Sequence, residues 1–230
     1  MYKKRHLIVS VTKGKKEDTL LYKNITECHN YDALHYDIDD FLFIENNKCV
    51  LSKVYNMIMR ENSNRVDYIH FIHDDVEILD KWQRVCADIE SRPDWMIQGV
   101  AGASKIEIKY PSLWNIMGDP KSFKGSLHHF TEDGTQLFST PCGLRPAQTV
   151  LLDGVYLCVN VDLYKTGKWK FDEQFNFHHY DLAASLDAVN LGYKIGVANI
   201  NIAHKSHGLH SLNDKEWQES NDLFLKKYKK

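Results

Sequence analysis

Hydrophobic and polar positions follow two different periods through residue 91, and each change of period marks a new element. Three short apolar runs are typical of buried strands, namely His6–Thr12, Phe41–Asn47 and Val66–Asp75. Helical spacing follows each run, over Glu17–Cys28, over Val50–Arg60 and over Asp80–Ser91, where Asp80 is a candidate N-cap. This succession of strands and helices predicts an α/β fold, in which parallel strands are joined by right-handed crossovers.

The second half of the chain is less regular at first. Residues 105–147 lose periodicity and collect glycine and proline, which predicts an irregular excursion or lid. Two apolar stretches around Asp153 follow, and then a helix over His178–Leu191, a strand over Tyr193–His204 and an amphipathic helix over Lys215–Tyr228. With 230 residues and 43% hydrophobic content, the chain is expected to form one domain over residues 1–230.

Charge and cysteine content exclude several classes of protein. The 29 Lys and Arg nearly balance the 31 Asp and Glu, so the net charge of -2 gives no overall attraction to nucleic acid or anionic lipid. Five widely spaced cysteines without a C-x-x-C pair argue against a disulfide framework or a zinc knuckle. No transmembrane segment or signal sequence is visible, so a cytoplasmic location is expected. The basic ends, YKKR and KKYKK, leave a peripheral membrane contact open.

Polar residues gather where the three predicted parallel strands end. Thr12, Glu45 and the group His73-Asp74-Asp75 occupy these ends, and ligands of open parallel sheets bind there. The adjacent carboxylates could form a solvated turn, cap the next helix or bind a divalent cation. Mg²⁺ or Mn²⁺ commonly sits on one or two carboxylates while substrate phosphates complete its ligands.

Three later side chains are further candidates for chemistry. His204 and His207, after the last predicted strand, could be surface residues, core residues or metal ligands. Asp181 lies near the start of a helix, where the dipole stabilises a carboxylate and where a general base could equally sit. The residues alone leave these alternatives open.

The order of these segments resembles the GT-A-fold glycosyltransferases, in particular the inverting family two and its bacterial glycosyltransferase-like relatives. The pieces that carry the resemblance are IVSVTKG, FIENN, SKVYNMIM, FIHDDVEI, LLDGVYLCVN, KFDEQFNFHHYDLAASL and LGYKIGVANINIAHKSHG. It covers most of the chain except about residues 105–147. It implies a Rossmann-like, three-layer α/β/α sandwich with a mostly parallel central sheet.

The resemblance also implies roles for individual residues. The donor-binding residues would be Thr12, Glu45, Asn56, His73 and Asp74, with His73 standing where relatives have the first acid of a D-x-D element. Asp75 would bind the metal together with His204 or His207. Asp153 and Glu173 would face the sugar and the acceptor, and Asp181 would be the general base.

The implied reaction is the transfer of a hexosyl or pentosyl group from a nucleoside-diphosphate sugar, with a UDP-sugar favoured, to an acceptor hydroxyl. It would invert the anomeric centre and depend on Mn²⁺ or Mg²⁺. The favoured acceptor is a cell-envelope or capsular glycan. A hydroxymethylated base of phage-type modified DNA is the alternative, and it would have to be flipped out of the duplex. A nucleotidyltransferase or a non-catalytic domain that binds nucleotide sugars is the rival of a different class.

Overall fold

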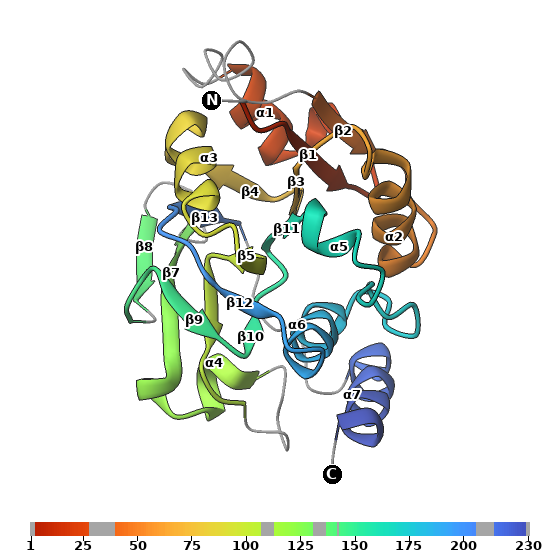
Figure 1. The fold of residues 1–230 in the computed structure, drawn as a ribbon, viewed down its shortest axis with the longest axis vertical. Helices are drawn as coiled ribbons and strands as arrows, with labels where there is room; N and C mark the ends of the chain where they lie inside the picture. Colours follow the sequence, from red (N-terminus) through yellow and green to blue (C-terminus); the bar gives the residue numbers. More distant parts are fainter. Residues whose placement is uncertain are drawn as a thin grey trace.

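The computed structural model describes residues 3–27, 40–106, 113–130, 137–141, 143–205 and 214–228 (Figure 1). Its main sheet has seven strands in the order β2-β1-β3-β11-β5-β12-β9. These strands are β1 (His6–Val11), β2 (Asp40–Ile44), β3 (Tyr68–Ile72), β5 (Trp95–Gly99), β9 (Ala147–Thr149), β11 (Tyr156–Asn160) and β12 (Lys194–Val197). The pairings of β1 with β2 and β3, and of β5 with β12, are parallel, whereas β11 and β9 run antiparallel to their neighbours. The sheet is therefore mixed, although most of its strands share one direction.

A second, smaller sheet has the order β10-β6-β7-β13-β4, and β8 pairs with β7. Its strands are β4 (Val76–Ile78), β6 (Ala101–Ala103), β7 (Phe123–Phe130), β8 (Leu137–Pro141), β10 (Leu151–Leu152) and β13 (Ile202–His204). Two of these strands, β7 and β8, thus lie in the described parts of residues 105–147, where the sequence predicted an irregular excursion, and a short helix at Trp114–Met117 and a 3-10 turn at Pro120–Ser122 precede them. Alternation across β7 explains the difference, because Gly125 and Leu127 are buried between less buried neighbours.

Helices cover both faces of the main sheet. They are α1 (Leu20–Glu27), α2 (Leu51–Asn62), α3 (Trp82–Glu90), α4 (Trp114–Met117), α5 (Val161–Tyr164), α6 (Tyr180–Asn190) and α7 (Lys215–Tyr228), with short 3-10 turns at Lys16–Asp18 and Pro120–Ser122. Figure 1 shows α6 beside α7, near the C-terminal end of the described chain. No helix of the described residues has the length and apolar character that a membrane crossing requires.

The side chains of β1 alternate between two apolar clusters, and this alternation defines three layers. Leu7 and Val9 pack in one cluster with Tyr55 of α2, and residues of α6 complete it. Ile8 packs in the other cluster with Leu21 of α1 and with residues of α3. Burying one such aliphatic side chain contributes roughly 1.5–3 kcal/mol. The predicted α/β/α architecture is confirmed.

The strand predicted over Tyr193–His204 is divided into β12 in the main sheet and β13 in the smaller sheet. Asp80 stabilises the turn between them. Its carboxylate accepts hydrogen bonds from the backbone and side-chain nitrogens of Asn201, which lies between β12 and β13. Asp80 therefore holds a turn far along the chain, and the predicted N-cap is wrong because Lys81 precedes α3 without a side-chain cap. The turn redirects the chain so that β13 pairs with β4.

Candidate active site

Two strand ends meet at the centre of the site. The segment His73-Asp74-Asp75 joins β3 to β4, and β13 pairs antiparallel with β4 so that His204 lies opposite Val76. The backbone N–H of Lys205 also donates to the carbonyl of Asp75 at 2.9 Å. As a result, one potential ligand atom from each of His73, Asp75 and His204 lies within 4.8 Å of the other two. We call these three residues the His-Asp-His cluster.

The electrostatics of the His-Asp-His cluster fit a cation. Nε2 of His204 lies 3.2 Å from Oδ1 of Asp75, and this contact pairs the imidazole with a buried carboxylate oxygen. Burial lowers the pKa of His73, as expected for a neutral imidazole. Burial also opposes charge on His204, but the Asp75 carboxylate outweighs it and raises the pKa of His204. A buried carboxylate oxygen that faces two imidazoles is a donor set that divalent metal ions accept when they displace the proton of His204.

A second set of contacts orients His73. Nε2 of His73 lies 3.0 Å from the hydroxyl of Tyr180, and that hydroxyl donates its proton to the carbonyl of Gly154 at 2.9 Å. With the tyrosine proton on this carbonyl, the His73 tautomer that completes the contact carries its proton on Nε2. The lone pair on Nδ1 then remains for a cation, an arrangement common among metal-binding histidines.

Asp181 lies in the first turn of α6, beside the turn that joins β10 to β11. Its Oδ2 accepts from the N–H of Gly154 at 2.8 Å, and its Oδ1 accepts from the N–H of Leu182 at 2.9 Å. Burial, reinforced by the nearby Asp153 carboxylate, raises the pKa of Asp181 to about 7 despite these donors. A carboxyl group with a pKa near 7 exchanges protons readily at neutral pH, as a general base must.

The close approach at Gly154 yields one testable prediction. A Cβ at this position would lie 2.4 Å from the Tyr180 hydroxyl oxygen and 3.0 Å from Cβ of Asp181. We expect Gly154→Ala to lower the free energy of unfolding by about 1–3 kcal/mol, because the rigid tyrosine must move. Thermal unfolding measures this, with Gly14→Ala as the control since a Cβ there meets nothing within 4 Å. Equal effects of the two changes would contradict the close packing.

The residue before α6 has a strained backbone, and α7 holds it in place. His179 has φ of 62°, in the left-handed region that a residue with a Cβ rarely adopts. The Ser220 hydroxyl of α7 donates to the carbonyl of His178 at 2.8 Å and lies 2.9 Å from Nδ1 of His179. Since the serine proton points to the carbonyl, Nδ1 of His179 donates to the serine oxygen. Ser220 thus fixes the backbone that leads into Tyr180 and Asp181.

Removing this hydroxyl is a second prediction. Ser220→Ala leaves the His178 carbonyl and the His179 imidazole without their partner, so we expect the free energy of unfolding to fall by about 1–3 kcal/mol. Urea denaturation measures the loss. Ser63→Ala is the matched control, because its hydroxyl makes an exposed bond to the carbonyl of Arg60. The control should stay within about 0.5 kcal/mol of the parent, and a Ser220 variant as stable as the control would refute the proposed support.

The donor-side residues from the first two strands lie together. The loops after β1 and β2 are joined by hydrogen bonds from Thr12 N to Ile44 O and from Asn47 N to Thr12 O, each 2.9 Å. Thr12 is buried, while Glu45 is exposed and accepts from the N–H of Lys16 at 3.0 Å. These two loops therefore form one surface. The start of α1 links them to the site, because Leu21 N donates to Asp74 O at 3.1 Å.

Asn56 and Glu173 contact each other directly. The buried Asn56 amide donates to Phe171 O at 2.8 Å and to Glu173 Oε1 at 3.0 Å, and its oxygen accepts from Phe171 N. These bonds fasten residues 171–173 to α2, so the observed contacts of Asn56 are structural. His207 lies outside the described residues.

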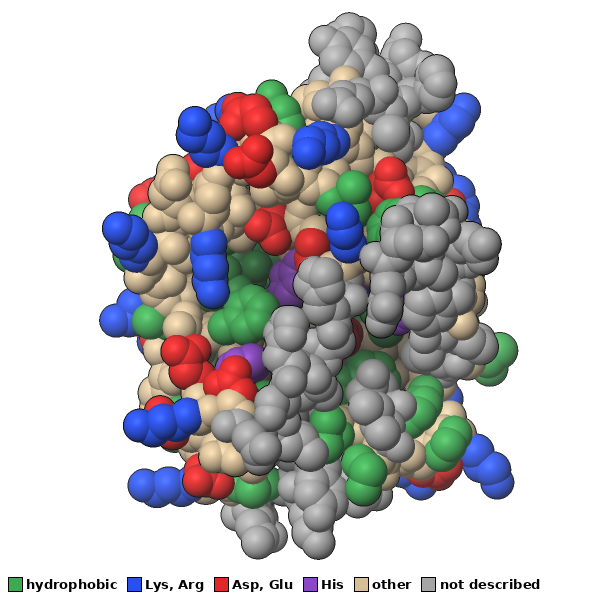
Figure 2. Space-filling model, turned by 180° about the vertical axis from the view of Figure 1, so that it is seen from behind, with side chains coloured by type: hydrophobic (Ala, Val, Ile, Leu, Met, Phe, Trp, Pro, Cys, Tyr) green, Lys and Arg blue, Asp and Glu red, His purple; other side chains and the backbone are tan. Residues whose placement is uncertain are grey.

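Tyr180, Gly154 and Ser220 are parts of the site that the sequence reasoning did not select. A signal existed for the first two, because Tyr180 adjoins Asp181 and Gly154 adjoins Asp153. Ser220 gave none, since a serine inside an amphipathic helix is ordinary. On the face seen in Figure 2, acidic and histidine side chains surround a hollow with hydrophobic side chains beside it.

The layers, the mixed sheet and the acid-rich strand ends define a GT-A-type α/β fold. A family model described as "Glycosyltransferase like family" matches residues 21–228, and the chain belongs to this family. The resemblance to GT-A-fold glycosyltransferases that the sequence showed is therefore confirmed. No curated protein matches the chain.

Solved structures support the fold at low sequence identity. One is GalNAc-T7 with UDP, GalNAc and Mn²⁺, which has a TM-score of 0.52 and 8% identity, over 97% of this chain and 48% of that chain. Another is the catalytic domain of Drosophila beta1,4galactosyltransferase 7 in complex with xylobiose. It has a TM-score of 0.51 and 12% identity, over 95% of this chain and 79% of that chain. A third is the mannosyltransferase PcManGT from Pyrobaculum calidifontis, with GDP-Man and Mn²⁺. It has a TM-score of 0.50 and 11% identity, over 91% of this chain and 59% of that chain. The chain spans about half the length of the first of these proteins.

Proposed function

We propose that this protein is a metal-dependent glycosyltransferase that moves a sugar from a nucleoside-diphosphate sugar to an acceptor hydroxyl with inversion. The observation that carries the proposal is Asp181, a carboxyl group with its pKa raised to about 7, whose neighbour Tyr180 contacts His73 of the His-Asp-His cluster. Family membership supports the same reaction class.

The His-Asp-His cluster would hold the divalent ion, with Mn²⁺ as our first choice and Mg²⁺ as the second. Oδ1 of Asp75 and the unprotonated ring nitrogen of His73 would be its donors, and His204 would complete the set. When bound, the ion supplies positive charge against the diphosphate leaving group. His207 is a further proposed ligand.

The remaining chemistry belongs to Asp181. The acceptor oxygen forms a bond to the anomeric carbon while the bond from that carbon to the diphosphate oxygen breaks. The electron pair leaves with the nucleoside diphosphate, and the hydroxyl proton passes to the Asp181 carboxylate. Backbone donors at Gly154 and Leu182 fix the orientation of this carboxylate before substrate arrives. Attack from the side opposite the leaving group inverts the anomeric centre.

The surface of Thr12 and Glu45 would bind the nucleoside, and Asp74 with Asp153 would face the sugar. We take a UDP-sugar as the first donor to test and a GDP-sugar as the second. A glycan is our preferred acceptor over modified DNA, because a chain with a formal charge of -2 offers no general attraction to a polyanion.

Thermal unfolding with a panel of nucleoside diphosphates and their sugar forms tests the proposal. Each ligand is added with Mn²⁺, with Mg²⁺ or with a chelator. A ligand at about 100 times its Kd stabilises the folded state by about 2.7 kcal/mol, which is a readily measured shift. We expect a metal-dependent shift for one base and its sugar forms. Metal-independent shifts would argue against the cluster, and no shift with any nucleotide would overturn the proposal.

A further inference from the structure

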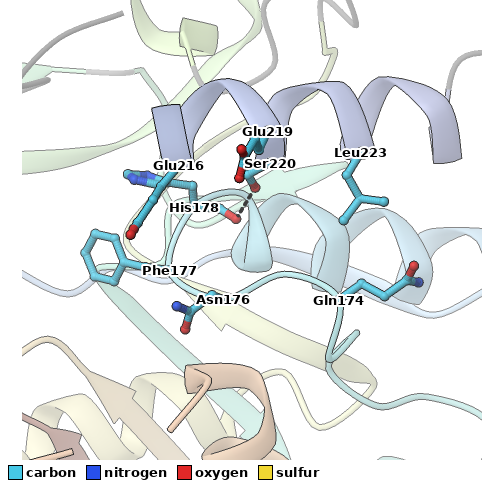
Figure 3. A pocket seen from close by; sticks show the side chains of 8 residues that line it. All are labelled: Gln174, Asn176, Phe177, His178, Glu216, Glu219, Ser220 and Leu223. Atoms are coloured by element: carbon cyan, nitrogen blue, oxygen red, sulfur yellow. Dashed lines mark hydrogen bonds between the residues drawn. The ribbon is translucent and has the colours of Figure 1, made fainter. Parts of the chain in front are cut away.

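A pocket of about 230 Å³ opens between α7 and the loop that precedes α6 (Figure 3). Asn176, Phe177 and His178 form the loop side, and Glu216, Glu219 and Leu223 line the side of α7. Its volume is smaller than that of a pocket for a drug-sized ligand, which is about 300–1,000 Å³. It suits a ligand group the size of a single sugar ring.

Two contacts connect this pocket to the candidate active site. The Phe177 ring stacks on the imidazole of His73, with ring centroids 6.0 Å apart and planes inclined by 25°. Ser220 lines the pocket and also binds the carbonyl of His178, three residues before Asp181. A molecule in the pocket therefore lies beside the same backbone that positions the proposed base.

The pocket combines an apolar surface with hydrogen-bond acceptors. Phe177 is 53% exposed, which is unusual for a large aromatic side chain, and Leu223 adds an aliphatic surface. The oxygen of Asn176 accepts from Leu51 N, which fastens the loop side of the pocket to the start of α2. The carboxylates of Glu216 and Glu219 offer only acceptor oxygens.

The charge on the pocket is negative. Burial lowers the pKa of His178, with Lys13 acting in the same direction and Asp214 and Glu216 opposing. The imidazole is therefore neutral at pH 7. Lys215 pairs with Glu219 at 3.6 Å, but both side chains are exposed and such pairs are weak, so the lysine offsets only part of the charge of the two glutamates. The pocket repels phosphate and carboxylate groups and attracts hydroxyl hydrogens, which form strong bonds to carboxylates.

We propose that this pocket is the acceptor subsite and that it binds an uncharged carbohydrate residue. The C–H face of a sugar ring matches the exposed ring of Phe177, and sugar hydroxyls match Glu216 and Glu219. Its identification as the acceptor's site rests on the proposed glycosyltransferase function. The same charge disfavours uronic acids, phosphorylated sugars and the phosphate backbone of DNA at this position.

Saturation-transfer NMR on the full chain tests this without a donor nucleotide. The probes are the methyl glycosides of glucose and of glucuronic acid, which differ by one carboxylate. We expect the parent protein to bind the glucoside at least tenfold more tightly than the glucuronide. In the double variant Glu216→Gln and Glu219→Gln, glucoside affinity should fall by about tenfold, because two charged acceptors are lost, while glucuronide affinity should rise.

Asp222→Asn is the matched control. Asp222 is an exposed residue of the same helix, α7, but it does not line the pocket. Removing its carboxylate should leave the affinities for both glycosides unchanged. Equal binding of the two glycosides by the parent protein would overturn the proposal, as would no binding of either. The outcome is separate from that of the nucleotide panel, because saccharide binding is read without donor. A nucleotide-dependent protein that fails the glycoside test would keep its proposed function and lose only this acceptor subsite.

Discussion

Asp181→Asn is expected to reduce sugar transfer by at least a hundredfold, while nucleotide binding stays within about twofold of the parent. Asparagine cannot take the proton of the attacking hydroxyl, and general-base help is worth about 10²–10⁴ in rate. Its oxygen can still accept one of the hydrogen bonds from Gly154 and Leu182, so the start of α6 should hold. Product formation measures transfer, and the thermal shift with nucleotide and Mn²⁺ measures binding.

The matched control is Asp187→Asn, which removes a carboxylate further along the same helix. Asp187 pairs with Lys227 of α7, away from the turn at Gly154, so this variant should keep transfer. Full activity in the Asp181 variant would remove it from the mechanism. Equal loss of transfer and of nucleotide binding would assign it a structural role.

The raised pKa of Asp181 adds a dependence on pH. The folded state holds this proton up to about pH 7, whereas the unfolded chain releases it near 3.8, so stability falls as pH rises between these values. Asp153 and the hydroxyls of Tyr55 and Tyr180 are the other titratable groups facing this carboxyl. Asp181→Asn should therefore gain about 1–3 kcal/mol over the parent at pH 8, and less at pH 5. Transfer by the parent should increase with pH through about 7.

Thermal unfolding of both proteins at pH 5 and pH 8 checks the stability difference. A constant difference across this range would show that the carboxyl titrates at its ordinary pKa. Transfer that does not change between pH 6 and pH 8 would show that proton removal by this group does not limit the rate.

Asp75→Asn is expected to weaken nucleotide binding in Mn²⁺ at least tenfold, to the level seen with chelator. The amide replaces the one negatively charged donor of the His-Asp-His cluster. Even partners that only orient metal ligands cost 10–100-fold in metal affinity when they are removed, so a direct ligand should cost at least as much. Isothermal titration with nucleoside diphosphate, with and without Mn²⁺, measures the change.

Glu77→Gln is the control for this variant, because it removes a carboxylate from the adjoining strand β4 but lies outside the cluster. Its nucleotide affinity should equal that of the parent under both conditions. A metal-dependent affinity that survives Asp75→Asn would place the cation elsewhere.

Local patterns predicted the elements of this fold well. The apolar runs at β1, β2 and β3 are short, β-branched or aromatic, and end in polar residues, which fixes them as buried strands. The final helix begins at Lys215 and ends at Tyr228 as predicted, because its apolar positions recur at helical spacing over the whole length. The β7 strand was missed because FKGSLHHF has histidines and a glycine where apolar alternation is expected.

Distant pairings could not be predicted in the same way. His204 reaches Asp75 only because β13 pairs with β4, and that pairing depends on the turn that Asp80 holds at Asn201. Hydrophobic spacing carries no information about which distant strands become neighbours. The sequence identified the participants in the candidate site through their order along the chain, while the support from Ser220 and the pocket beside Phe177 required the folded chain.

The place of β11 in the main sheet has a consequence for biosynthesis. This strand lies between β3 and β5, so the sheet cannot close until Tyr156–Asn160 has left the ribosome. Until then, the facing edges of β3 and β5 have unpaired backbone groups that could pair with another chain. Nascent chains that stop before this strand should therefore depend on chaperones and aggregate, and the first half of the protein should not fold independently.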